Sequence, residues 1–114
     1  MTFTPLELAV LRSIRERHPA DSKALEAQLA TATVLNRQTT GVGFYTHLRV
    51  ERITAAAIGG ERLRSAPPTR IKGLEHEMGF VLWLVEGYAD CLEGFPYGDE
   101  STEGIALETL TIRQ

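Results

Sequence analysis

The stretch GFVLWLVEGYADCLEGFPYG, residues 79–98, decides the fold of this chain, because it contains the densest apolar run, the only Trp and the only Cys. Residues 80–85 are rich in β-branched and aromatic side chains and are too few to span a bilayer, so they predict a strand buried on both faces. Glu86 and Gly87 interrupt the run, and an extended pattern resumes over residues 88–93. This order predicts a central β-hairpin.

Two turns can close this hairpin. A two-residue turn pairs Val85 with Tyr88 but requires a positive φ at Glu86, which is unfavourable. A three-residue loop with Gly87 at the bulge position closes instead on Leu84 and Tyr88, and we expect this second register. The hairpin's second strand is expected to end within residues 94–98, where a proline and two glycines interrupt the pattern.

Two helices are expected before the sheet. Thr4-Pro5-Leu6-Glu7 has the pattern of a capping box with Pro in the first turn, and His18-Pro19 ends the helical spacing that follows. Asp21 is a candidate N-cap for a second helix over residues 22–30.

Several shorter segments complete the expected fold. Residues 59–68 end in a diproline and are expected to form a mobile loop, whereas residues 51–58 fit either a helical turn or a tapering strand. Four segments have the composition of strands: residues 33–39, 44–50, 70–74 and 104–112.

These elements predict one α+β domain over residues 1–114, with two N-terminal helices packed on a mostly antiparallel sheet of five or six strands. Alternate residues of the 80–85 strand point to opposite faces, and both sets are apolar, yet only one helical layer is evident. The second face of this strand must therefore be covered either by another part of the same chain or by another chain. A homodimer that uses the sheet surface and intrachain cover are equally compatible with the sequence.

The composition is that of a folded domain. The 114 residues are 43% hydrophobic and 24% charged, which argues against disorder and membrane insertion. The N-terminus lacks the basic start and apolar region of a signal peptide, and a single cysteine forms no internal disulfide. We therefore expect a cytoplasmic protein that does not associate with membranes.

The net charge of −3 hides an asymmetry, since residues 1–72 sum to +5 and residues 73–114 to −8. One interpretation is that acidic strands pair with basic strands across the sheet. The other is an acidic face that docks a basic protein partner and repels nucleic acid. Four residues are candidates for protein interaction: Trp83, Asp99, Glu100 and Glu103.

No phosphate loop, dinucleotide motif, zinc-protease motif, serine-hydrolase motif or C-x-x-C pair occurs, so no catalytic residue, metal site or cofactor is assigned. Tyr45, His47 and Arg49 share the polar face of the 44–50 strand and, with Glu93, are candidates for a ligand pocket between the sheet and the 59–68 loop. Cys91 is expected to be a buried structural cysteine rather than a nucleophile.

Three segments carry a resemblance: TGVGFYT at 40–46, GFVLWLVEG at 79–87 and LEGFPYG at 92–98. Over residues 35–100 the chain resembles short bacterial proteins of unknown function with a G-x-G-F strand and an L-E-G-[FY] strand end. The resemblance implies a small cytosolic α+β protein without an established activity. Some such proteins resemble immunity proteins of toxin systems, which would suit the acidic C-terminal half.

The sequence thus leads us to expect a non-enzymatic protein-interaction or immunity-like module that acts as a homodimer. The alternative is a small-molecule-binding protein or minor hydrolase with its pocket beside residues 59–68.

Overall fold

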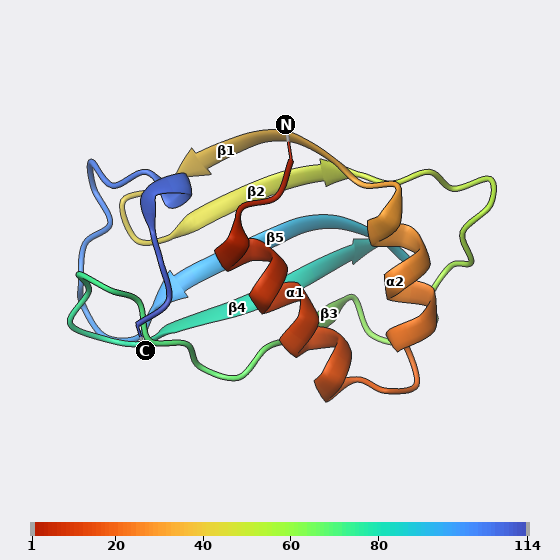
Figure 1. The fold of residues 1–114 in the computed structure, drawn as a ribbon, viewed down its shortest axis with the longest axis horizontal. Helices are drawn as coiled ribbons and strands as arrows, with labels where there is room; N and C mark the ends of the chain where they lie inside the picture. The colour runs from red at the N-terminus through yellow and green to blue at the C-terminus, as the bar shows by residue number, and fades with distance from the viewer. Residues whose placement is uncertain (1, 114) are drawn as a thin grey trace.

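The computed structural model describes residues 2–113, in which two helices pack on one face of a five-stranded antiparallel sheet (Figure 1). The strand order is β1-β2-β5-β4-β3, and the expected α+β fold is confirmed. The elements in chain order are α1 (Pro5–Arg17), α2 (Ser22–Ala30), β1 (Thr33–Thr39), β2 (Phe44–Arg49), β3 (Leu63–Ser65), β4 (Met78–Val85), β5 (Tyr88–Pro96) and the 3₁₀ helix η1 (Leu107–Thr109). Among the described residues, no helix has the length and apolar character needed to cross a membrane.

Helix α1 begins as its sequence predicts. The Thr4 hydroxyl accepts the Glu7 N–H at 3.1 Å, and the Glu7 carboxylate accepts the Thr4 N–H at 2.8 Å. This capping box satisfies two backbone donors that would otherwise lack partners. The helix ends at Arg17, ahead of Pro19, and its apolar face is buried against the sheet.

Helix α2 has the predicted range and Asp21 is its N-cap residue, but the capping hydrogen bond expected from the Asp21 side chain does not form. The Asp21 carboxylate instead accepts a hydrogen bond from Arg64 Nε at 2.6 Å. Arg64 is only 7% exposed. A buried guanidinium without an anionic partner costs more free energy than a helix end without a side-chain cap, so the Asp21 carboxylate pairs with Arg64.

The predicted hairpin register is wrong. Val85 pairs with Tyr88, so the turn has two residues, Glu86 at φ 54° and Gly87 at φ 85°. Positive φ at both positions is typical of a type I′ turn, whose twist matches that of the strands. The Gly87 carbonyl accepts the Ile58 N–H at 2.8 Å and the Gln28 amide at 3.0 Å. These tertiary hydrogen bonds and the favourable twist outweigh a cost of about 1 kcal/mol for the left-handed Glu86.

Two other predictions of local structure fail because tertiary contacts decide them. The expected 59–68 loop contains β3, because the outer edge of β4 has backbone groups that need partners. Residues 104–112 form no strand: Leu107 and Leu110 are buried in the core from around η1. Ile71 and Ile112 form a single β-bridge, which is what remains of the strands expected at 70–74 and 104–112.

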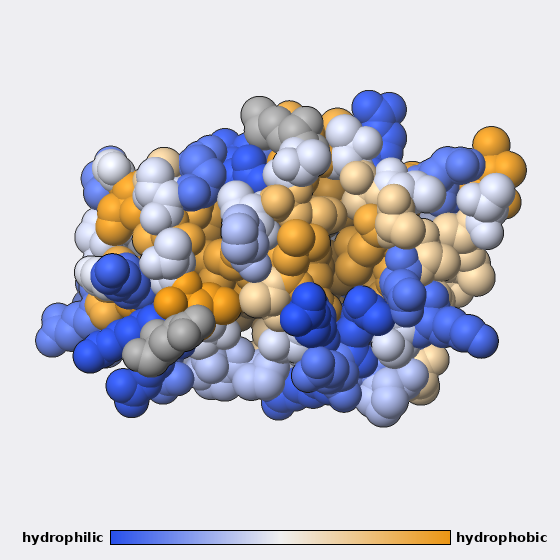
Figure 2. All heavy atoms as spheres, viewed as in Figure 1, coloured by the Kyte–Doolittle hydropathy of each residue, from blue (hydrophilic) through white to orange (hydrophobic). Residues whose placement is uncertain are grey.

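One face of the sheet lies under the helices. Figure 1 shows both helices in front of the strands, and Figure 2 shows the same side with hydrophilic side chains gathered along its lower edge. The side chains buried beneath the helices come from alternate strand positions: Phe44, Thr46, Leu48, Phe80, Leu82, Leu84 and Leu92. The alternation predicted for β2 is thereby confirmed.

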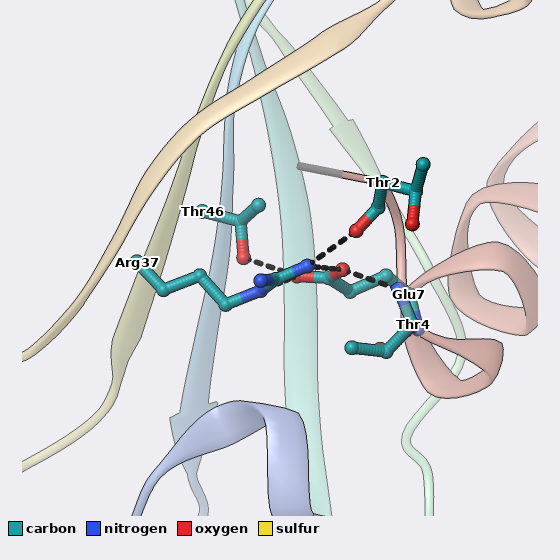
Figure 3. Close-up of polar contacts among 5 residues, drawn as sticks. All are labelled: Thr2, Thr4, Glu7, Arg37 and Thr46. Carbon is teal, nitrogen blue, oxygen red and sulfur yellow. Dashed lines mark hydrogen bonds and ion pairs between the residues drawn. The ribbon is translucent and has the colours of Figure 1, made fainter.

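A buried ion pair joins α1 to this face (Figure 3). Glu7 is fully buried, and its Oε1 accepts from Arg37 Nη2 at 2.7 Å as well as from the Thr4 N–H. Its Oε2 accepts from Arg37 Nε at 3.0 Å and from the Thr46 hydroxyl. Arg37 Nη2 also donates to the Thr2 carbonyl at 2.8 Å. The carboxylate therefore ties α1 to β1 and β2 at once.

Burial alone would raise the pKa of Glu7, but the hydrogen bonds from Arg37, Thr46 and Thr4 and the Arg37 charge together hold that pKa below its ordinary value of 4.5. A carboxyl whose folded pKa is depressed contributes stability that is present above the unfolded pKa and is lost as pH falls through the folded one. We therefore expect the free energy of unfolding to fall below about pH 4.5, in part through Glu7.

Glu7→Gln should remove this part of the acid dependence and lower stability at neutral pH by about 3–5 kcal/mol, because the neutral Gln side chain cannot form the buried ion pair with Arg37. Urea unfolding between pH 2 and pH 7 measures both effects. The double variant Glu7→Leu with Arg37→Met removes both charges and should recover most of the loss. A single variant as stable as the original protein, with the same acid profile, would contradict the role of the pair.

The left-handed Glu86 generates a second prediction. Glu86→Asn should raise the free energy of unfolding by about 0.5–1 kcal/mol, because Asn tolerates positive φ in a type I′ turn. Glu77→Asn is the matched control, since Glu77 is also exposed and has no positive φ. Thermal unfolding measures the stability of both variants. An equal change in stability at the two positions would contradict the claim that Asn relieves the left-handed conformation at position 86.

Candidate functional site

The sheet surface opposite α1 and α2, called the helix-free face below, is the candidate functional site. Side chains that alternate with the buried ones point to this surface, and most of them are only partly exposed. No described helix covers them (Figure 1). The side chains of this face are Gln38, Tyr45, His47, Val81, Trp83, Cys91, Glu93 and Phe95.

A hollow of about 440 Å³, called the trough below, lies on this face. Trp83 on β4, Cys91 on β5 and His47 on β2 are direct cross-strand neighbours. Since adjacent strands are ~4.8 Å apart, the Trp83 and His47 backbones stand about 10 Å apart with a small thiol between them. Tyr45 continues the second wall, with its ring centre 5.9 Å from that of His47. The trough therefore has aromatic walls and a narrow floor at Cys91.

Two hydrogen-bonding contacts orient the walls. Trp83 Nε1 donates to Glu93 Oε1 at 2.8 Å, so the indole is held against β5. His47 Nε2 lies 3.3 Å from Gln38 Oε1 on β1. The rim carries charges from several elements, namely Arg62 ahead of β3, Glu86 in the turn and Asp90 in β5. Arg52 pairs with Glu86 at 3.3 Å, in an exposed contact.

Cys91 is 7% exposed and has no disulfide partner. Burial, with the nearby carboxylates of Asp90 and Glu93, raises the pKa of its thiol to about 11. A thiol with that pKa is protonated at neutral pH and is a weak nucleophile. The proximity of His47 in the adjacent strand therefore does not make a nucleophile–base pair.

The structure brings three of the four predicted ligand residues together and places the fourth elsewhere. Tyr45 and His47 line the trough, and Glu93 lies beside it through its hydrogen bond to Trp83. Arg49 does not line the trough: it is exposed at the end of β2 and borders another hollow. From residues 59–68, Arg62 lines the trough.

The predicted acidic interaction residues do not line the trough. Both carboxylate oxygens of Glu100 accept backbone N–H groups, from Glu75 at 2.8 Å and His76 at 3.0 Å, and these bonds lower the pKa of Glu100. Asp99 and Glu103 are exposed. Glu100 therefore fastens the loop after β5 to the segment before β4, whereas the other two remain solvated.

The basic and acidic halves of the chain meet at two places. Arg52 pairs with Glu86 at 3.3 Å, and the charge of Glu108 acts on Arg37. Most acidic side chains of residues 73–113 are nevertheless exposed. Among residues 2–113, no group of three His, Cys, Asp or Glu side chains is placed to hold a metal ion.

Sequence reasoning missed Arg62, Gln38 and Asp90 as trough residues. Asp90 is the extra residue where the pairing of β4 with β5 shifts between Trp83 and Leu84. Such a bulge has no marker in the apolar pattern. Arg62 lay in a segment predicted to be a loop, and its place follows from the pairing of β3 with β4.

The buried thiol generates a prediction. Alkylation of native Cys91 by iodoacetamide should be at least tenfold slower at pH 8 than alkylation of the urea-unfolded chain, and its rate should still rise with pH above 10, because the thiolate forms only near pH 11. Mass spectrometry of quenched samples measures both rates. A native thiol that reacts as fast as the unfolded one would contradict its burial and raised pKa.

Comparisons of the chain with protein-family models, with curated proteins and with solved structures gave no match.

Proposed function

We propose that this chain is a non-enzymatic protein-interaction module whose helix-free face binds a protein partner with a basic surface. The observation that carries the proposal is the row of partly exposed aromatic and aliphatic side chains on that face, which no described helix covers. Soluble proteins rarely leave such side chains together without a use. An immunity-like role would be one case, since it requires docking on another protein and no chemistry.

The composition of the face resembles that of protein interfaces. Trp and Tyr are enriched among the residues that contribute most binding energy, and Trp83 and Tyr45 lie on strands that flank β5. Val81 lies opposite Glu93 in the next row. An apolar centre with charges at its rim is the usual anatomy of a binding surface.

The charges favour a basic partner over a second copy. The face and its rim carry the carboxylates of Asp90 and Glu93 and the cation of Arg62, while Glu86 pairs with Arg52. In a two-fold dimer the same surface meets itself, so the excess carboxylates would approach one another. The homodimer expected from the sequence remains an alternative occupant of this face, which the oligomeric state tests.

A second candidate function rests on the trough. Its volume of about 440 Å³ is within the range of small-molecule sites, and its walls combine aromatic rings with a few polar groups. A small-molecule-binding protein would use Tyr45, His47 and Trp83 to hold its ligand.

Pull-down from a lysate of the native host tests the main proposal. The original chain should retain a basic protein that Val81→Arg loses, because the new cation repels the partner and interrupts the apolar centre. The recovered protein, once purified, should bind the original chain with a defined stoichiometry in calorimetry and more weakly in high salt. Leu8→Arg is the matched control, since Leu8 is 51% exposed on α1, away from the helix-free face.

Equal recovery by the Val81→Arg and Leu8→Arg chains would overturn the proposed surface. Light scattering at micromolar concentrations shows whether the helix-free face binds a second copy of the chain or a different protein. A monomer supports a different partner, whereas a dimer that Val81→Arg dissociates would assign the face to a second copy.

A further inference from the structure

The geometry of the trough points to one kind of chemical group. Its walls are the Trp83 ring on one side and the His47 and Tyr45 rings on the other, with about 10 Å between the strands that carry them. The hollow of about 440 Å³ that these rings line is large enough for an ammonium or guanidinium group, and an aromatic ring attracts a positive charge over ~6 Å. The small Cys91 side chain between the walls leaves this space open.

The electrostatics of the trough also favour a positive charge. Glu93 accepts the indole N–H of Trp83, which increases the electron density of the ring and strengthens its attraction for a cation. Asp90 lies at the rim, and no hydrogen bond or ion pair joins its side chain to another described residue. At the floor, burial is the main cause of the raised pKa of the Cys91 thiol, and the charges of Asp90 and Glu93 add to it.

We propose that the trough binds an organic cation, an ammonium or guanidinium group, which the basic partner supplies as a Lys or Arg side chain. This inference rests on the proposed function, because the partner that covers the helix-free face brings the cation with it. Aromatic walls with nearby carboxylates are the general means by which proteins bind such groups, and neither feature requires a metal or a reaction.

Arg62 works against this binding and therefore offers a sharp test. Its side chain is exposed at the rim, on the β3 side, where water screens its charge. Removal of this charge should strengthen cation binding, whereas removal of the Asp90 charge should weaken it. Two substitutions in one hollow with opposite effects are not expected from a general loss of structure.

The experiment titrates the intact chain with choline and, as a neutral probe of the same shape, 3,3-dimethyl-1-butanol. Trp83 is the only Trp, so its fluorescence reports on the trough itself. Choline should change the fluorescence with a dissociation constant on the order of millimolar, and the neutral probe should bind at least tenfold more weakly. Equal binding of the two probes, or no saturation by choline at 100 mM, would overturn the proposal.

Four variants are titrated with choline in the same way. Arg62→Gln should tighten choline binding about threefold and Asp90→Asn should weaken it about threefold. Tyr45→Leu keeps an apolar wall but removes the ring, and it should weaken binding further. Glu77→Gln is the control, since it removes an exposed carboxylate that does not line the trough. Thermal unfolding checks each fold, and unchanged affinities in Arg62→Gln and Asp90→Asn would also overturn the proposal.

A capped lysine peptide and choline distinguish the source of the cation. Tighter binding of the peptide supports a side chain of a protein partner, whereas tighter binding of choline would assign the site to free organic cations and overturn that part. Failure of the inference is separable from failure of the proposed function. A partner that is lost in Val81→Arg, with no cation binding in the trough, would leave the interaction surface standing and remove only the cation site.

Discussion

The buried carboxylate of Glu7 is the constraint on which the rest of the structure depends. An ionised carboxylate without water is stable only where donors surround it, and here Arg37, Thr46 and the Thr4 N–H provide them. The same carboxylate closes the capping box of α1, so the start of the helix and its docking on the sheet are one interaction. Arg37 and Thr46 lie on one face of two strands. Helix α1 therefore docks on that face, and the opposite face remains without a helix.

The character of the free face follows from this placement. A strand such as β4, with apolar side chains on both sides, is usual where two layers cover a sheet. Here Phe80 and Leu82 are buried under the helices, while Val81 and Trp83 are only partly covered. The apolar run that decides the fold thus supplies both the core and the candidate site.

The shape of the site comes from pairing that is decided over long distances. The two-residue turn at Glu86 and Gly87 is held by Gln28 and Ile58, and the bulge at Asp90 then places Cys91 opposite Trp83. A register shifted by one residue would move the side chains of one strand to the other face. The trough depends on hydrogen bonds from α2 and the 55–58 segment as much as on the strands that line it.

The sequence by itself determined the two helices, the capping box, the strands that begin at Thr33 and Phe44, and the central hairpin. It also determined the alternation that puts Tyr45 and His47 on one face. These features depend on neighbours within a few residues. Only the tertiary structure decided the turn register, the strand inside 59–68, the 3₁₀ turn near the C-terminus, the ion pair of Glu7 and the grouping of Trp83, Cys91 and His47. The physical reason is that a buried charge, an unpaired strand edge and a strained turn are each stabilised by residues distant in the chain, whose positions no local pattern specifies.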